Sequence, residues 1–141
     1  IEQEVQGDWI PDFCGIIDVA WYIEETHSLI ILDHKTGRNT RYSPTSLQMM
    51  SYAVMLYDKL VSEGYQIDRI GLEIYQPECE FREDRLRRTG VAAEIIDEWR
   101  TQIQQVINYA REHSDEYHAD PYRCKYCPYR AHCQNNASIS C

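Results

Sequence analysis

Two aspartates and a lysine lie within or at the end of two apolar, strand-like runs, and this arrangement limits what the chain can fold into. The first run, residues 13–23, contains Asp18, and the second, residues 28–35, ends on Asp33-His34-Lys35. Apolar residues that alternate or run continuously are typical of core strands. The polar stretch between the runs indicates a hairpin turn. We therefore predict two neighbouring antiparallel strands that carry Asp18 and Asp33.

The rest of the chain adds two helices and further strands. Ser43-Pro44 predicts a helix start, and apolar residues recur at helical spacing from Leu47 until Gly64. Residues 1–6 and 67–75 have strand patterns, and residues 92–113 carry the stripe of a second helix. This order predicts an α/β or α+β class, with a mixed sheet flanked by helices.

The last part of the chain differs from the rest. Residues 119–141 have little apolar periodicity and contain four of the six cysteines, Cys124, Cys127, Cys133 and Cys141. Such crowding is typical of metal ligands rather than of a disulfide framework. We predict one domain with a core over residues 1–118 and a C-terminal cysteine-rich metal-binding segment over residues 119–141, packed on that core.

Charge and hydropathy narrow the functional classes. The net charge of −9 argues against a protein that binds nucleic acid mainly through its overall charge. Four arginines nevertheless form a local basic group at residues 82–88. No run of 18 or more apolar residues occurs, and no signal peptide opens the chain. These features predict a cytoplasmic protein without membrane association. The chain begins at Ile1 with strand-like residues, so we expect a segment upstream of it.

The acid–lysine pattern fits a divalent metal site. Mg²⁺ and Mn²⁺ prefer oxygen ligands, which Asp18, Asp33 and the His34 backbone carbonyl would supply. The strand period of two places Lys35 on the same face as Asp33, where its ammonium would hold or polarise an activated water. The alternatives are a turn at Asp33 and a structural ion pair between Asp18 and Lys35.

Gln48 and Tyr52 form an i, i+4 pair on the predicted helix. Both polar ends therefore reach the same point near the strand ends. Packing at the edge of the core is the alternative explanation for this pair.

Three motifs in this order resemble a known family. Gly15-x-x-Asp18, Asp33-x-Lys35-Thr36-Gly37 and Gln48-x-x-x-Tyr52 look like the RecB-type branch of the PD-(D/E)xK nuclease superfamily. The resemblance implies a restriction-endonuclease-like mixed central sheet flanked by helices. It also implies that Asp18, Asp33, Lys35, Gln48 and Tyr52 form the catalytic set.

The cysteine spacing resembles that of the iron–sulfur members of this branch, which include helicase–nuclease subunits, CRISPR adaptation nucleases and phage exonucleases. In them, three closely spaced cysteines and one distant cysteine bind a 4Fe-4S cluster. The resemblance assigns Cys124, Cys127 and Cys133 to the cluster and leaves the fourth ligand open between Cys141 and Cys14. The spacing alone equally suits structural Zn²⁺, with His118 or His132 in reach.

The combined expectation is a metal-dependent DNA nuclease with Mg²⁺ or Mn²⁺ at the acidic pair. An exonuclease that acts on DNA ends or single strands fits best, in recombination, repair or phage DNA processing, with a helicase or recombination protein as partner. The alternative is a non-catalytic DNA-binding or assembly module that keeps the fold and its cysteine site. An intact acid–lysine set favours the enzyme.

Overall fold

The computed structural model describes residues 3–7, 9–10, 13–38, 42–114, 124, 127–128 and 130–132. The chain divides into two compact units, residues 1–105 and 106–141. Both sheets and the first helix belong to the first unit, which is described below. The predicted boundary between residues 118 and 119 stays a prediction.

The described secondary structure consists of β1 (Gln3–Gln6), β2 (Cys14–Ile17), β3 (Val19–Ile23), β4 (Ser28–His34), α1 (Leu47–Ser62), β5 (Arg69–Tyr75), β6 (Leu86–Ala92) and α2 (Ile96–Glu112). Short 3-10 turns lie at Glu24–Thr26, Arg82–Arg85, Ala93–Ile95 and Arg130–His132. No helix in this described part combines the length and apolar character needed to cross a bilayer.

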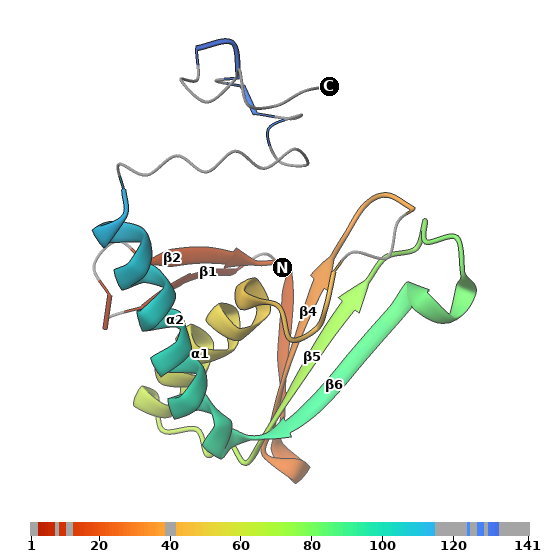
Figure 1. Cartoon of the computed structure of the whole chain (residues 1–141). Coiled ribbons are helices and arrows are strands. Elements are labelled where there is room, and N and C mark those ends of the chain that lie inside the picture. The colour runs from red at the N-terminus through yellow and green to blue at the C-terminus, as the bar shows by residue number, and fades with distance from the viewer. Residues whose placement is uncertain are drawn as a thin grey trace. The chain divides into compact units, whose positions relative to one another are not determined.

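The central sheet has the strand order β3-β4-β5-β6 and is mixed. β4 and β5 run parallel, whereas β3 and β6 pair antiparallel with their neighbours. β1 and β2 form a separate antiparallel pair. Figure 1 shows β4, β5 and β6 side by side, with α1 next to the sheet. The predicted restriction-endonuclease-like architecture, a mixed sheet with helices, is confirmed.

The core lies between the sheet and α1. Alternate residues of β4 and β5 face α1 and are buried, because successive strand side chains point to opposite faces. These residues and their partners on α1 are Leu29, Ile31, Ile70, Leu72, Ile74, Met49, Ala53 and Leu56. Each large aliphatic side chain contributes about 1.5–3 kcal/mol when fully buried. This packing fixes the first turn of α1 near the end of β4.

The predicted strand over residues 13–23 is in fact two strands. The chain bends at Asp18, so that β2 pairs with β1 and β3 pairs with β4. A charged side chain that interrupts an apolar run marks this change of sheet. Ile17 before the bend is fully buried, and Val19 after it is exposed.

Two helix boundaries also differ from prediction. Ser46, not Ser43, caps α1, since its Oγ accepts a hydrogen bond from the Met49 amide at 3.4 Å. The Ser43 hydroxyl instead accepts from the Thr45 amide in the preceding turn. The second helix begins at Ile96 rather than at Ala92, because residues 86–92 form the unpredicted strand β6 and Ala93–Ile95 form a 3-10 turn.

Candidate active site

Asp18 occupies the bend between β2 and β3. Its Oδ2 accepts a hydrogen bond from the backbone amide of His34 at 2.7 Å. The β3–β4 ladder pairs Val19 with Leu32, so Asp18 lies one step beyond this pair, beside Asp33. The bend thus places the first predicted carboxylate at the end of β4, next to the second.

Asp33 and Lys35 form an ion pair at the same end of the sheet. Asp33 lies on the buried face of β4 and is only 4% exposed. Lys35 Nζ is 2.8 Å from Asp33 Oδ2. The Lys35 amide donates to the Tyr75 carbonyl at 2.9 Å, which continues the β4–β5 ladder past His34. Lys35 therefore forms its ion pair with Asp33. The alternative considered from the sequence was an ion pair between Lys35 and Asp18.

Gln48 and Tyr52 extend this contact from the first turns of α1. Lys35 Nζ donates to Gln48 Oε1 at 2.9 Å, and Gln48 Nε2 donates to the Tyr52 hydroxyl at 2.8 Å. A Cβ on Gly15 would come within 2.7 Å of Tyr52 Cε1. The three predicted motifs thus meet in one place, and Gly15 leaves room for the Tyr52 ring.

An aromatic ring adds to the surroundings of the lysine. Lys35 Nζ lies 5.0 Å from the centroid of the Tyr42 ring, within the range of a cation–π interaction. The Lys35 ammonium therefore contacts a carboxylate, an amide oxygen and a ring, which together restrict its position.

The acidic pair fits a divalent cation. The buried Asp33 Oδ2 receives no directed hydrogen bond within the described residues, because the Lys35 ammonium lies at ion-pair distance but off the hydrogen-bond direction. A buried carboxylate oxygen of this kind is suited to a metal ion. Mg²⁺ commonly takes one or two carboxylates and keeps several waters. The described part of the chain contains no cluster of three His, Cys, Asp or Glu side chains that could hold a metal ion.

The predicted cysteine site is described only in part. Cys124 is half-buried and Cys127 is exposed, and the Cys127 amide donates to the Cys124 carbonyl at 3.2 Å. Cys133, Cys141 and His118 lie outside the described residues. Cys14, an exposed residue of β2, forms no disulfide within the described chain. The choice among fourth ligands stays open.

The prediction missed two residues near Lys35. Gln76 follows β5 and is fully buried, and Arg87 lies on β6 beside it. Both contact the loop after Lys35. Gln76 Nε2 donates a hydrogen bond to the Gly37 carbonyl, and Arg87 Nε donates one to the Tyr42 carbonyl. Arg87 belongs to the predicted basic group, but its guanidinium hydrogen-bonds within the protein. The only sequence feature that could have drawn attention to Gln76 was its place as a polar residue directly after an apolar strand.

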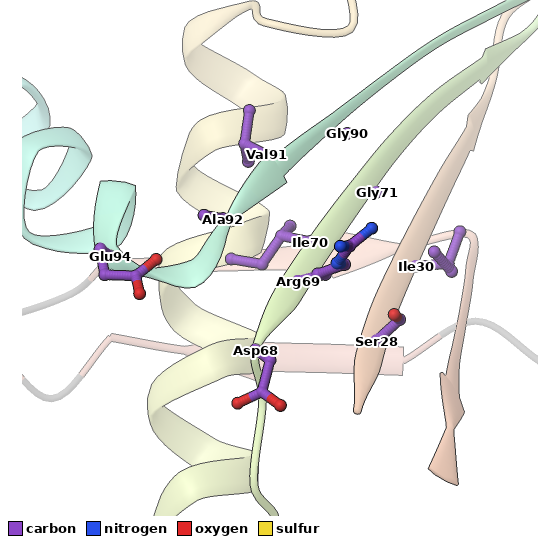
Figure 2. Close-up of a pocket in the computed structure, with 10 residues that line it drawn as sticks. All are labelled: Ser28, Ile30, Asp68, Arg69, Ile70, Gly71, Gly90, Val91, Ala92 and Glu94. Atoms are coloured by element: carbon purple, nitrogen blue, oxygen red, sulfur yellow. The ribbon is translucent and has the colours of Figure 1, made fainter. Parts of the chain in front are cut away.

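A hollow of about 480 Å³ lies at the opposite end of the sheet, where β4 and β5 begin. Gly71 and Gly90, which pair across β5 and β6, both line it. A Cβ at Gly90 would meet open space, whereas a Cβ at Gly71 would come within 2.6 Å of Ile30 Cδ1. Figure 2 shows its rim, with Asp68, Arg69 and Glu94. The hollow contains none of the predicted catalytic residues, which gather at the other end.

Comparison with families of known proteins identifies the family of the chain. The sequence profile of the PD-(D/E)XK nuclease superfamily matches residues 2–134. No curated protein and no solved structure matches the chain. Members of this superfamily are typically nucleases that cleave phosphodiester bonds, and they generally use Mg²⁺ or Mn²⁺.

Proposed function

The chain belongs to the PD-(D/E)XK nuclease superfamily, and from this premise we propose that it is a Mg²⁺- or Mn²⁺-dependent DNA nuclease of the RecB-like branch. The observation that carries the proposal is the continuous contact from Asp33 through Lys35 and Gln48 to Tyr52, with Asp18 held beside it. An exonuclease that acts on DNA ends or single strands, in recombination, repair or phage DNA processing, is the specific form proposed.

Asp18 and Asp33 are the proposed metal ligands, together with the backbone carbonyl of His34. When bound, the ion would lower the pKa of a coordinated water and neutralise charge on the phosphate. The His34 amide holds one Asp18 oxygen, so the Asp18 side chain is oriented before any ion arrives. Burial of Asp33 excludes water from one side of the pair.

Lys35 has the proposed role of orienting the nucleophilic water. Its ammonium donates protons only, so it can bind the oxygen of that water or of the phosphate. Gln48 accepts one of its hydrogen bonds, and the Tyr52 hydroxyl accepts from Gln48 in turn. This relay fixes the rotamer of Lys35, and the precise placement of catalytic groups accounts for a large share of catalysis.

We propose that the cysteine-rich segment binds a 4Fe-4S cluster, with structural Zn²⁺ as the alternative. Cys124, Cys127 and Cys133 are the proposed ligands, and Cys141 is the proposed fourth. Thiolates serve both metals, so ligand type does not separate them. The hydrogen bond from the Cys127 amide to the Cys124 carbonyl supports a shared centre, because it keeps the two residues close.

The test is a cleavage assay with labelled linear single-stranded, linear duplex and circular DNA. We expect Mg²⁺- or Mn²⁺-dependent degradation of linear DNA that EDTA abolishes. Asp33→Asn, which keeps the shape of the side chain, should remove the activity. Cleavage of circular DNA would show that the protein is an endonuclease rather than the proposed exonuclease. DNA binding without cleavage under any metal would favour the non-catalytic module.

A helicase or recombination protein is the proposed partner. Stable association of purified chain with such a protein, measured by size-exclusion chromatography, would test this part separately from cleavage.

A further inference from the structure

Gly37, two residues after Lys35, has both of its backbone polar groups bound by side chains of the segment that follows β5. Its amide donates to Glu78 Oε2 at 3.1 Å, and its carbonyl accepts from Gln76 Nε2 at 2.9 Å. The backbone has φ of +94° here, which favours glycine. The turn that follows the catalytic lysine is therefore held by specific contacts on both sides.

Arg87 fixes the orientation of the Gln76 amide. Arg87 Nη2 donates to Gln76 Oε1 at 2.8 Å. A guanidinium only donates, so the oxygen of Gln76 must face Arg87 and its nitrogen must face Gly37. Gln76 is fully buried. A buried amide with both ends matched to a partner has one stable orientation.

Arg87 also binds the other end of the loop. Its Nε donates to the Tyr42 carbonyl at 3.0 Å, and the Tyr42 ring lies 5.0 Å from Lys35 Nζ. In the ladder, Arg87 pairs with Ile74, which in turn pairs with Asp33, so Arg87 shares the buried face with the catalytic carboxylate. The pair Gln76 and Arg87 thus contacts the segment after Lys35 at two described residues, Gly37 and Tyr42.

We propose that Gln76 and Arg87 are positioning residues of the active site, which hold the loop so that Lys35 keeps its catalytic position. This inference rests on the proposed nuclease function. The hydrogen bonds of Gln76 and Arg87 to other described residues go to Gly37, Tyr42 and Asp84 rather than to the acidic pair, so we assign them a positioning and not a catalytic role. A misplacement of about 1 Å in a catalytic group lowers rates by about 10²-fold, so small movements of this loop suffice.

The test compares Gln76→Glu and Arg87→Lys with wild type at a temperature where all are folded. A glutamate at 76 keeps the contact to Arg87 but cannot donate to the Gly37 carbonyl. A lysine at 87 keeps the charge but has one nitrogen for three acceptors, the Tyr42 carbonyl, the Asp84 carbonyl and Gln76 Oε1. We expect kcat to fall about 10- to 100-fold while KM for DNA changes less than about twofold. Hydrogen exchange at the Gly37 amide should rise at the same time.

Matched controls lie at the opposite end of β5. Gln66→Ala removes a glutamine just before the strand, and Arg69→Lys changes its first residue. Both should leave kcat and Gly37 exchange at wild-type values. Gln76→Met, which is similar in size and apolar, replaces Gln76→Glu if the glutamate variant does not fold, with the same expected fall in kcat.

The outcomes separate the two proposals. If wild type cleaves DNA and Lys35→Ala does not, while Gln76→Glu and Arg87→Lys keep wild-type kcat, the positioning role is overturned and the nuclease stands. A matching fall in kcat in the Gln66 and Arg69 controls would also overturn it, since the effect would then be general. If wild type does not cleave, or Lys35→Ala cleaves equally well, the proposed function fails and the positioning role fails with it.

Discussion

The backbone amide of His34 donates a hydrogen bond to Asp18 Oδ2 at 2.7 Å, across the point where β3 and β4 stop pairing. The main chain of the second motif thus orients the carboxylate of the first. This contact does not depend on the charge of Asp18, because a neutral amide oxygen could accept the same bond.

Asp18→Asn should therefore separate structure from chemistry. The asparagine oxygen can still accept from His34, so the free energy of unfolding should change by less than about 0.5 kcal/mol. Cleavage should fall at least about 10²-fold, because a metal ligand loses its charge. Asp18→Ala should lose activity and also about 1 kcal/mol of stability, measured by urea unfolding. Full activity in Asp18→Asn would exclude Asp18 as a ligand.

Lys35→Ala should lower the cleavage rate at least about 10²-fold while metal binding survives, because the lysine acts on the water rather than on the ion. The variant leaves the buried Asp33 without its cation. Mn²⁺ should therefore raise its melting temperature at least as much as it raises that of wild type. Calorimetric titration with Mn²⁺ and single-turnover cleavage measure the two effects. Loss of metal binding in this variant would contradict the assigned role.

Gly15→Ala should destabilise the protein by about 1–3 kcal/mol, since the added methyl meets the Tyr52 ring at 2.7 Å. Replacing Tyr52 by Ala should remove most of this penalty. The double variant would then be more stable than the sum of the single changes predicts, by at least about 0.5 kcal/mol. Thermal or chemical unfolding of the four proteins gives the coupling. Additive changes would place the strain elsewhere.

Stability at acid pH should depend on Asp68. Hydrogen bonds from the Gln66 amide, then from His27, lower the pKa of the Asp68 carboxyl below its ordinary value of 3.8. A lowered pKa means that the folded protein favours the charged form. The contribution is therefore present above pH 3.8 and is lost as pH falls through the folded pKa.

Asp68→Asn should flatten the pH dependence of unfolding in this acid range, and Gln66→Ala should raise the Asp68 pKa toward its ordinary value. Carboxyl NMR titration measures the second effect directly. An Asp68 pKa that does not respond to Gln66→Ala would reject the hydrogen bond as the main cause.

Cys127→Ser should release the metal proposed for the cysteine-rich segment and lower the thermal stability of that segment, since metal binding supplies folding free energy to small metal-stapled modules. Metal analysis and the absorption of anaerobically prepared protein distinguish iron–sulfur from zinc. The sheet has its own core and should still show a cooperative transition. Disulfides at Cys124 and Cys133 in metal-free protein would contradict this assignment.

Local spacing explains which parts of the fold and site could be predicted. The apolar stripe of α1 repeats with the helical period, and Gln48 and Tyr52 are neighbours on the surface of the same helix by the i, i+4 rule. Asp33 and Lys35 are two residues apart on an extended chain, and this separation alone puts them on one face. Contacts of this kind lie within one helix or one strand, so the residue period of that element is enough to predict them.

Strand β6 and the loop contacts could not be predicted this way. Arg87 lies on the face of β6 that turns to the core, where an apolar residue would be expected, so the alternation of the strand is hidden. The contact between Gln76 and Gly37 joins residues 39 positions apart. It depends on the parallel pairing of β4 with β5, which no local pattern specifies. The break at Asp18 was concealed because both flanking stretches are apolar.

Because β4 and β5 run parallel, both strands begin at one end of the sheet and finish at the other, and the full strand length separates these two ends. Lys35 and Gln76 follow the strand ends, whereas His27 and the Gly64 turn lie where the strands begin. Seven residues of extended chain span about 23 Å. A biotinylation peptide inserted after Gly64 would therefore tether the molecule to a surface with the proposed active-site end of the sheet free, so that the proposed digestion could be followed on single DNA molecules.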